Sequence, residues 1–571
     1  MDNSAKTPTY FETIVLTLTE SLNDPDHVWI SIHDLIEAYN VISRKIRTLA
    51  SALTSTDQVP SFLAIFEVKS TQITECLTRD IRCMLLDTQR SYGNTSSYSQ
   101  EPDENDVEVA IDYSVLCLNA LRFVSHIFTF RAIYSNFTGT FDCKIIVSAA
   151  LIRLTEDQLT SILDDVLSLC TIENPSTYNG TKLSEMALWI LKTQELPSPI
   201  LIHQKSRILM AFKNSISGNI GSIDAFKVKV NYRPFNLYTK VFQAVHRILE
   251  KFPSFSIWLI ELLPMILEHL NGIAPDSRVH AAFALCGFAS AKIALGLADE
   301  FPQEYAIQTV MAYLDKEAIQ PRTIETESRT ITLLVTALTN GSYSPAFSLS
   351  IVSCFIVLLE DAALTYGRSI RLITRVLAPC ERHKSGIVRL MHTEIWIMLI
   401  WSYSLLPTDT EDQSRKMGKT PRENAYTFLC EALSDRSRLA FIHILLGTNR
   451  SRSDVRRAID LIGKIIDGDD ACNHKGVKLL CHLLSTIGSS FVGNAQPHPK
   501  FPFALELVNG LYLLRPPAEI KIPETNVDMK QLLPLTEKEV LQEWQKLSSI
   551  WVRAVQHSLD CDRELSVSST V

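Results

Sequence analysis

Residues 255–270 read FSIWLIELLPMILEHL and carry apolar side chains at helical spacing along the whole stretch. Apolar residues that recur every three or four positions form one buried face of an α-helix. Pro264 lies inside this run, and its ring and missing N–H predict that the helix kinks or divides there. The apolar positions are Phe255, Trp258, Leu259, Leu262, Leu263, Ile266, Leu267 and Leu270.

A second helix is predicted directly after this one. Residues 271–277, NGIAPDS, have the composition of a turn, and Asp276 is the candidate N-cap of a helix over 278–295. Two amphipathic helices joined by a short turn pack as an antiparallel pair. Such a pair is therefore the expected building unit of the fold.

Helical stripes of the same kind recur along nearly the whole chain. The pairs repeat at roughly 40 residues, which is the period of HEAT and armadillo arrays, but they share no consensus. Residues 225–235 alternate instead and are predicted to form an extended linker. The sequence thus predicts an all-α fold, an irregular HEAT/armadillo-like helical-repeat superhelix (α-solenoid). The stripes cover residues 27–50, 60–86, 107–130, 156–170, 182–195, 199–214, 237–252, 325–339, 347–363, 385–405, 422–446, 452–466, 473–487 and 536–558.

The length of 571 residues exceeds what one hydrophobic core supports. A repeat array has no such limit, because each repeat contacts only its neighbours. We therefore expect a single extended array over residues 1–559 and a polar tail over 560–571. Polar composition predicts loops near 91–107, 407–421 and 497–502.

The composition narrows the class of protein. Hydrophobic residues make up 46% and charged residues 21% of the chain, which excludes wholesale disorder. The net charge of -8 is mild, so a contact with DNA would need a local basic surface. The first residues show no signal-peptide pattern, and the apolar runs 255–267 and 395–406 are too short to span a bilayer. We expect a cytosolic or nuclear protein without a membrane partner.

The sequence contains no phosphate-cradling Gly loop, no HExxH motif and no nucleophile elbow. We therefore expect no enzyme activity and no cofactor. Reduced core thiols are predicted for Cys117, Cys286, Cys354 and Cys481. Two Cys/His groups lack zinc-site spacing, and we interpret them as core thiols and surface imidazoles. These groups are Cys380 with His383, and Cys472 with His474, Cys481 and His482.

Two clusters of basic residues are the candidate DNA-binding sites. Residues 447–458, GTNRSRSDVRRA, place Arg residues beside a helix start that Asp454 is predicted to cap. Backbone amides at a helix start bind phosphate together with Arg, and about six contacts would give a salt slope near -5. The alternative is an ordinary solvated face. The candidates are Arg436, Arg438, Arg450, Arg452, Arg456 and Arg457 in one cluster, and Arg368, Arg371, Arg375 and Lys384 in the other, which also contains Arg382 and Arg389.

A series of motifs follows in fixed order over roughly residues 110–410. It begins with ALWILKTQELP, residues 187–197, and continues with VFQAVHRILEKFP, residues 241–253. The matched positions are Ala187, Leu188, Trp189, Gln194, Pro197, Pro253, Trp258, Leu263, Pro264, Arg278, Ala281, Ala282, Glu394 and Trp396. The series resembles the N-terminal domain of the Rap-interacting factor family. We predict that Trp189 and Trp396 fill the core between repeats.

The resemblance implies a nuclear, non-catalytic chromosomal scaffold. Members of the family bind DNA through the array, limit telomere length, delay late origins and influence break repair. They also recruit a type-one protein phosphatase through Arg-Val-x-Phe and Ser-Ile-Leu-Lys motifs. Here Ser161-Ile-Leu-Asp lacks the Lys and Lys229-Val-Asn-Tyr232 ends in Tyr, so neither is a convincing docking motif. The implied partners are duplex or telomeric DNA and telomere-bound proteins.

Family members are usually much longer, so this chain is interpreted as the N-terminal array alone. A second interpretation stays open, a protein-binding HEAT-repeat adaptor in nuclear transport or chromosome organisation. Such arrays bind peptides along a concave groove. Ladders of Asn and Trp on successive repeats would favour a transport adaptor, and the sequence has none.

Overall fold

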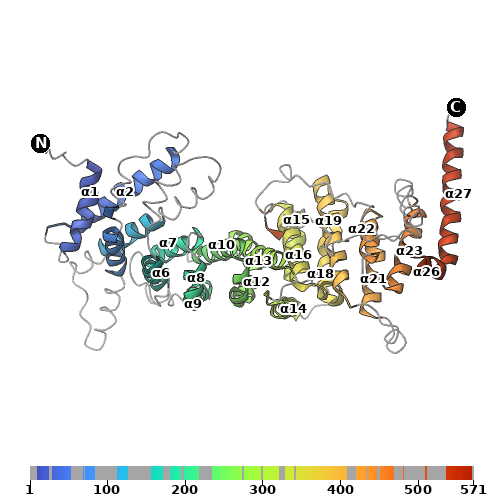
Figure 1. Ribbon diagram of the computed structural model, residues 1–571, viewed down its shortest axis with the longest axis horizontal. Helices are drawn as coiled ribbons and strands as arrows, with labels where there is room; N and C mark the ends of the chain where they lie inside the picture. The colour runs from blue at the N-terminus through green and yellow to red at the C-terminus, as the bar shows by residue number, and fades with distance from the viewer. Residues whose placement is uncertain are drawn as a thin grey trace. The chain divides into compact units, whose positions relative to one another are not determined.

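The computed structural model is all-α over the residues that it describes (Figure 1). No β-strand occurs among these residues, which confirms the predicted fold class. The superhelical form of the array stays a prediction. The structure describes residues 10–24, 29–52, 68–69, 71–83, 112–125, 156–170, 180–193, 198–217, 235–272, 275–296, 300–319, 328–339, 343–407, 420–433, 435–446, 451–468, 477, 480, 508–510, 513 and 535–568.

The chain divides into two compact units. The first comprises residues 1–266 and 272–284, and the second comprises 267–271 and 285–571. The division crosses the helices α12 (Leu263–Leu270) and α13 (Pro275–Leu295). The single array over 1–559 stays a prediction.

The first unit is built from helices that pack on their neighbours in the chain. α1 packs on α2, α6 packs on α7, α8 and α9, and α10 packs on α7 and α9. In α10, Val241, Val245 and Ile248 recur at helical spacing and are fully buried, so one face of the helix fits this core. The helices are α1 (Tyr10–Glu20), η1 (Ser21–Asn23), α2 (Ile32–Ala52), residues 71–83 and 112–125, α6 (Glu156–Cys170), α7 (Gly180–Thr193), α8 (Ser198–His203), α9 (Lys205–Ser217), α10 (Phe235–Lys251), η3 (Pro253–Phe255), α11 (Ser256–Leu259) and η4 (Ile260–Leu262).

The second unit is arranged around α16, which is buried at every position from Ala346 to Leu359. A helix that is apolar on all sides must lie inside the core. α15 packs on α16 and α18. α16 packs on α19, α19 packs on α22, and α22 packs on α23 (Figure 1). α27 packs on α23. The helices are α14 (Gln303–Ile319), α15 (Arg329–Thr339), α16 (Pro345–Leu359), α17 (Ala362–Thr365), α18 (Gly367–Glu381), α19 (Gly386–Leu405), α21 (Pro421–Ala432), α22 (Asp435–Leu445), α23 (Arg452–Ile466), α26 (Glu537–Gln542) and α27 (Trp544–Ser568).

Most predicted stripes correspond to helices, and 156–170 and 452–466 agree at both ends. Four stripes each contain two helices, because periodicity continues across a tight turn that it cannot detect. These pairs are α8 with α9, α16 with α17, α21 with α22, and α26 with α27. The prediction missed α1, α14 and α18. The buried residues of α18 do recur at helical spacing, so that helix was overlooked although its sequence carries the signal.

Several helix ends differ from the prediction. The helix over 255–270 does divide, but at the 3-10 turn η4, and Pro264 is the second residue of α12, where its missing N–H is harmless. Asp276 is not the N-cap of α13, because the helix already begins at Pro275. The predicted tail after residue 559 continues α27 as far as Ser568.

Other predictions lie largely outside the described residues. The loops 91–107 and 497–502 lie wholly outside them, and of the linker 225–235 only the start of α10 is described. Of the stripe 473–487, residues 477 and 480 are described. The structure describes only the two ends of the loop 407–421. At the second end, the Thr420 side chain accepts a hydrogen bond from the Glu423 N–H and caps α21.

One described helix, α13, is long and apolar enough to cross a membrane by length and composition alone. It is neither of the two apolar runs considered from the sequence. In its most apolar stretch, 56% of the residues are buried inside the protein. Buried core helices of proteins that do not enter a membrane have the same length and composition, so α13 is only weak evidence for a membrane span.

Candidate nucleic-acid interface

α18 carries the more exposed of the two predicted basic clusters. Positions 368, 371, 375 and 382 follow one another at spacings of three, four and seven residues, so they share one helix face. The opposite face buries Leu372, Ile373 and Val376 in the core of the second unit. We call the exposed basic residues the α18 stripe, which comprises Arg368, Arg371, Arg375 and Arg382, with Lys384 in the following turn.

The α18 stripe is only partly neutralised inside the protein. Arg368 forms an ion pair with Asp315 of α14 at 2.6 Å. Within the described part of the chain, no ion pair involves Arg371, Arg382 or Lys384. These exposed cations are therefore available to an anion in solution.

The turn after α18 holds Lys384 in place. Arg389 Nη1 donates to the backbone carbonyl of His383 at 2.5 Å and to that of Lys384 at 3.2 Å. The backbone N–H of Ser385 donates to His383 Nδ1 at 3.1 Å. The turn is thus held by His383 and by Arg389 of α19, and Lys384 is exposed.

The cluster around α23 is distributed differently. Arg452, the first residue of α23, is exposed, and no ion pair involves it among the described residues. Arg456 is about half exposed and pairs with the buried Glu543 at 3.0 Å. Arg438 of α22 is half-buried and donates to the Cys430 carbonyl at 3.3 Å. Arg450 and the side chain of Arg436 lie outside the described residues.

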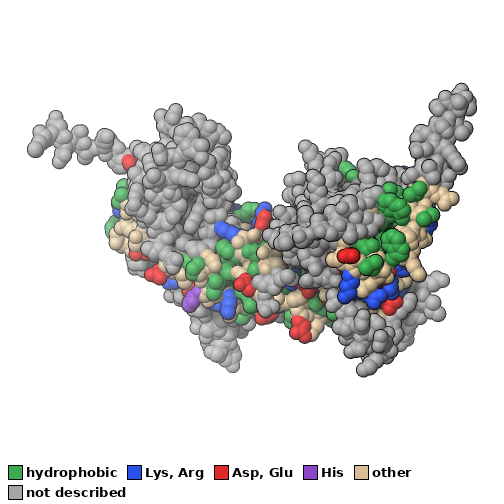
Figure 2. Space-filling model, turned by 45° about the vertical axis from the view of Figure 1, so that its right-hand side comes forward, with side chains coloured by type: hydrophobic (Ala, Val, Ile, Leu, Met, Phe, Trp, Pro, Cys, Tyr) green, Lys and Arg blue, Asp and Glu red, His purple; other side chains and the backbone are tan. Residues whose placement is uncertain are grey.

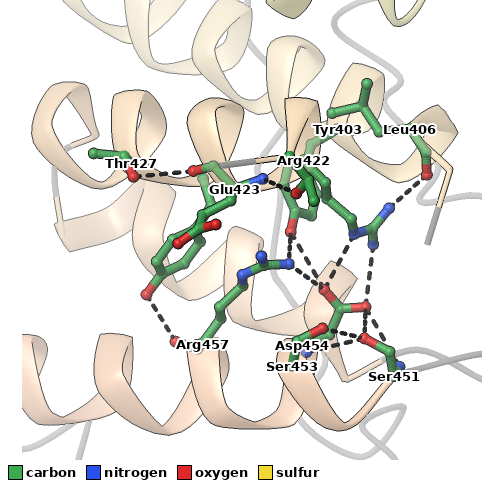
Figure 3. Close-up of polar contacts among 11 residues, drawn as sticks. Tyr403, Leu406, Arg422, Glu423, Thr427, Ser451, Ser453, Asp454 and Arg457 are labelled. Atoms are coloured by element: carbon green, nitrogen blue, oxygen red, sulfur yellow. Dashed lines mark hydrogen bonds and ion pairs between the residues drawn. The ribbon is translucent and has the colours of Figure 1, made fainter. Parts of the chain in front are cut away.

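Arg457 belongs to a buried polar network (Figure 3). Its Nη1 donates to the Tyr403 hydroxyl at 3.1 Å and to Asp454 Oδ1 at 3.3 Å, and only 11% of its side chain is exposed. A guanidinium held in this way is engaged inside the protein. Its assignment to a DNA surface therefore conflicts with the structure.

Asp454 is the centre of this network. Arg422 of α21 donates from Nε to Asp454 Oδ1 and from Nη2 to Oδ2, both at 3.2 Å, and from Nη1 to the Leu406 carbonyl at 2.6 Å. This bidentate pair connects α21, α23 and the end of α19 (Figure 3). The Arg422 guanidinium also lies 4.5 Å from the centroid of the Tyr403 ring.

The start of α23 explains why Asp454 faces inward. Ser451, not Asp454, is the N-cap: its hydroxyl accepts from the Asp454 N–H at 3.1 Å, and the Asp454 carboxylate accepts from the Ser451 N–H at 3.4 Å. This reciprocal arrangement is a capping box, in which the acidic residue stands at N3. The N-cap of α23 is therefore three residues earlier in the chain than the predicted Asp454.

The charges of the network agree with its geometry. Burial alone would raise the pKa of Asp454, but the Arg422 charge and the hydrogen bonds from Ser451 and Arg422 lower it below its ordinary value. Burial raises the pKa of the Tyr403 hydroxyl. Asp454 is thus an anion at neutral pH, and Tyr403 is a neutral hydrogen-bond donor and acceptor.

Trp189 differs from its predicted role as a core filler. Its ring is half-buried, and the ammonium groups of Lys192 and Lys240 lie 4.4 and 4.8 Å from the ring centroid. The Lys240 ammonium comes from α10 and the indole from α7, so this cation–π contact joins the two helices at the protein surface. Burial and the Lys240 and Arg247 charges lower the pKa of Lys192. Trp396, by contrast, is buried as predicted, with 6% of its surface exposed.

The thiols follow the prediction where they are described. Cys117, Cys286, Cys354 and Cys380 are free and buried. No group of three or more possible metal ligands occurs among the described residues, and Cys472, His474, Cys481 and His482 lie outside them. In the Ser161-Ile-Leu-Asp segment, Ile162 and Leu163 are core residues of α6, a placement that does not suit a docking motif.

No protein-family model matches the chain, and no curated protein matches it. The chain is similar to a crystal structure described as an engineered protein, with 12% sequence identity and a TM-score of 0.30. That match covers 76% of this chain and 97% of the engineered one. A TM-score of this size does not establish a common fold.

Proposed function

We propose that this chain is a non-catalytic chromosomal scaffold that binds duplex DNA through the α18 stripe. The observation that supports it is the row of exposed Arg and Lys on one face of α18, opposite a buried apolar face. Lys and Arg that neutralise phosphates provide affinity without reading the base sequence. Binding is accordingly non-specific and decreases as salt rises.

The resemblance to the Rap-interacting factor family supplies the biological setting of the proposal. In that setting the chain acts in the nucleus, at chromosomes and telomeres, in telomere length regulation, replication timing and break repair. The DNA contact belongs to α18 more than to α23, because Arg457 is buried and Arg456 is paired with Glu543. Arg452 remains as an exposed cation at the start of α23.

The test is fluorescence anisotropy with a labelled duplex across a salt series. The test variant combines Arg371→Ala, Arg375→Ala, Arg382→Ala and Lys384→Ala. Four phosphate contacts give a slope of roughly -3.6 on log axes, and their loss should flatten the slope and weaken binding at low salt by about tenfold or more.

A matched control combines Arg122→Ala, Lys205→Ala, Lys464→Ala and Lys538→Ala, which removes the same charge from exposed positions elsewhere. The control should retain most of the affinity and the parental slope. If both variants lose equal affinity, only net charge matters and the α18 stripe is not the site. A parent chain that binds no duplex overturns the proposal and favours the adaptor interpretation.

A further inference from the structure

α27 has a second apolar face that no described element covers. Trp544, Trp551, Val552 and Val555 are 60%, 41%, 61% and 45% exposed. Figure 2 shows hydrophobic side chains gathered directly below the grey C-terminal segment. Large apolar side chains gathered on one exposed helix face are typical of a contact surface. This face, the α27 ridge, is therefore suited to a contact with another polypeptide.

The other face of α27 is fully used within the chain. Leu547, Ile550 and Ala554 are buried against the second unit, and α27 packs on α23. Gly463 of α23 permits this close approach, because a Cβ there would lie 3.3 Å from Ile550 Cδ1. The ridge is thus a separate surface and not a poorly packed part of the core.

Three charged residues on or beside α27 are neutralised within the chain. Lys546 pairs with Asp460 at 2.7 Å, Arg553 pairs with Asp467, and Glu543 pairs with Arg456. The ridge positions themselves are apolar or are small and uncharged. Such a surface neither attracts a strongly charged partner nor repels an identical surface.

We propose that the α27 ridge pairs with the ridge of a second copy of this chain, with the two helices antiparallel about Ser548. Positions 544, 548, 551 and 555 have the spacing of a helix–helix seam. In a two-fold arrangement, residues equally distant from Ser548 meet: Trp544 packs on Val552 of the second copy, Trp551 packs on the aliphatic part of Gln545, Val555 packs on Leu541, and the two Ser548 residues meet at the axis. A small residue at the axis permits close approach, and each large indole meets a smaller side chain.

The area sets the strength of the dimer. The exposed parts of these side chains and of Leu541, which is 70% exposed, provide an apolar surface of roughly 500 Å² per copy. Two copies together bury roughly 1,000 Å², which is at the lower limit for a specific dimer. The dimer is therefore reversible and dependent on concentration.

Sedimentation velocity on the full chain from about 1 to 100 µM tests the proposal. The parent should shift from monomer to dimer, and the double variant Trp544→Glu/Val552→Glu should remain a monomer throughout. The matched control is Trp29→Glu, which changes an indole that is 85% exposed in the first unit, and it should dimerise like the parent. A parent that stays monomeric, or a double variant that dimerises, overturns the proposal.

Cross-linking tests the register without weakening the ridge. Under mild oxidation, Ser548→Cys should form a disulfide between copies at the two-fold axis. Ser549→Cys is the control, because its side chain is exposed on another side of the same helix turn and should not cross-link. Mass spectrometry identifies the linked peptides despite the native thiols. Equal cross-linking at both positions contradicts the antiparallel pairing about Ser548.

Discussion

α18 and α23 both carry several arginines at helical spacing, yet the structure uses them in opposite ways. On α18 the arginines lie exposed on the face opposite the core, and Arg368 forms an ion pair with Asp315. On α23, Arg457 is buried beside Asp454, and Arg456 pairs with Glu543 of the turn before α27. The comparison shows that the number of arginines in a segment does not predict how many reach solvent.

The difference arises from the neighbours of each helix. α23 lies between α22 and α27, so two of its sides face protein, and an Arg there must find an internal anion. α18 packs on α14, α15, α16, α17 and α19, but only its apolar face is buried and its arginines stay exposed. An exposed Arg pays no desolvation cost and needs no internal partner.

The largest expected difference is in stability. Arg422→Ala leaves the buried Asp454 without its bidentate partner and should lower the free energy of unfolding by roughly 3–5 kcal/mol. Arg371→Ala, on the open face of α18, should change it by less than about 0.5 kcal/mol. Urea unfolding followed by circular dichroism measures both.

The double variant Arg422→Ala/Asp454→Ala sharpens this test. It should cost less than the two single changes added together, because the Arg422–Asp454 pair is lost only once, although Arg457 also loses the carboxylate that it contacts. Equal stability losses for Arg422→Ala and Arg371→Ala would show that the buried network contributes nothing beyond a surface arginine.

A smaller effect on stability is expected when the pH is lowered. The pKa of Asp454 is lowered in the folded protein, so its contribution to stability is complete above the ordinary value of 3.8. That contribution is lost as the pH falls through the lower pKa of the folded state. Asp454→Asn should therefore flatten the decline of the melting temperature below pH 3.8. An unchanged decline would mean that other carboxylates determine the acid sensitivity.

The smallest effect should come from the exposed end of the α23 cluster. Arg456 is 51% exposed, although its partner Glu543 is buried, so solvent screens much of the pair. Arg456→Ala should lower the free energy of unfolding by about 1 kcal/mol or less. Lys464→Ala, an exposed residue of the same helix without a described ion pair, should change nothing measurable. If Arg456→Ala lowers the free energy of unfolding more than Arg422→Ala does, the half-exposed pair contributes more than the buried one, and the expectation is wrong.

Much of the fold followed from apolar spacing, and much of the candidate site did not. The stripes 156–170 and 452–466 were correct at both ends, because their apolar residues recur without interruption and their starts are polar. α18 was missed although its arginines had been singled out. Its buried residues Leu372, Ile373, Val376, Leu377 and Cys380 recur at helical spacing, so this helix could have been predicted from the sequence.

The Trp189 prediction failed for a related reason. Spacing showed that the residue lies on a helix with buried Leu183, Ala187 and Ile190, but not that its ring is at the edge of that face. The ammonium groups that cover it come from Lys192 on the same helix and from Lys240 on α10. A contact between residues far apart in sequence has no signature in the spacing of either one.

The sequence by itself determined that this protein is all-α and placed most of its helices. The reason is that an amphipathic helix needs apolar residues every three to four positions, a pattern that is local in the chain. It also showed where arginines gather. Only the tertiary structure decided which arginines face water, which secure the core and which face of α27 stays open. Those outcomes depend on the neighbours that each helix meets, since burial and the need for an internal partner are set by contacts between distant segments.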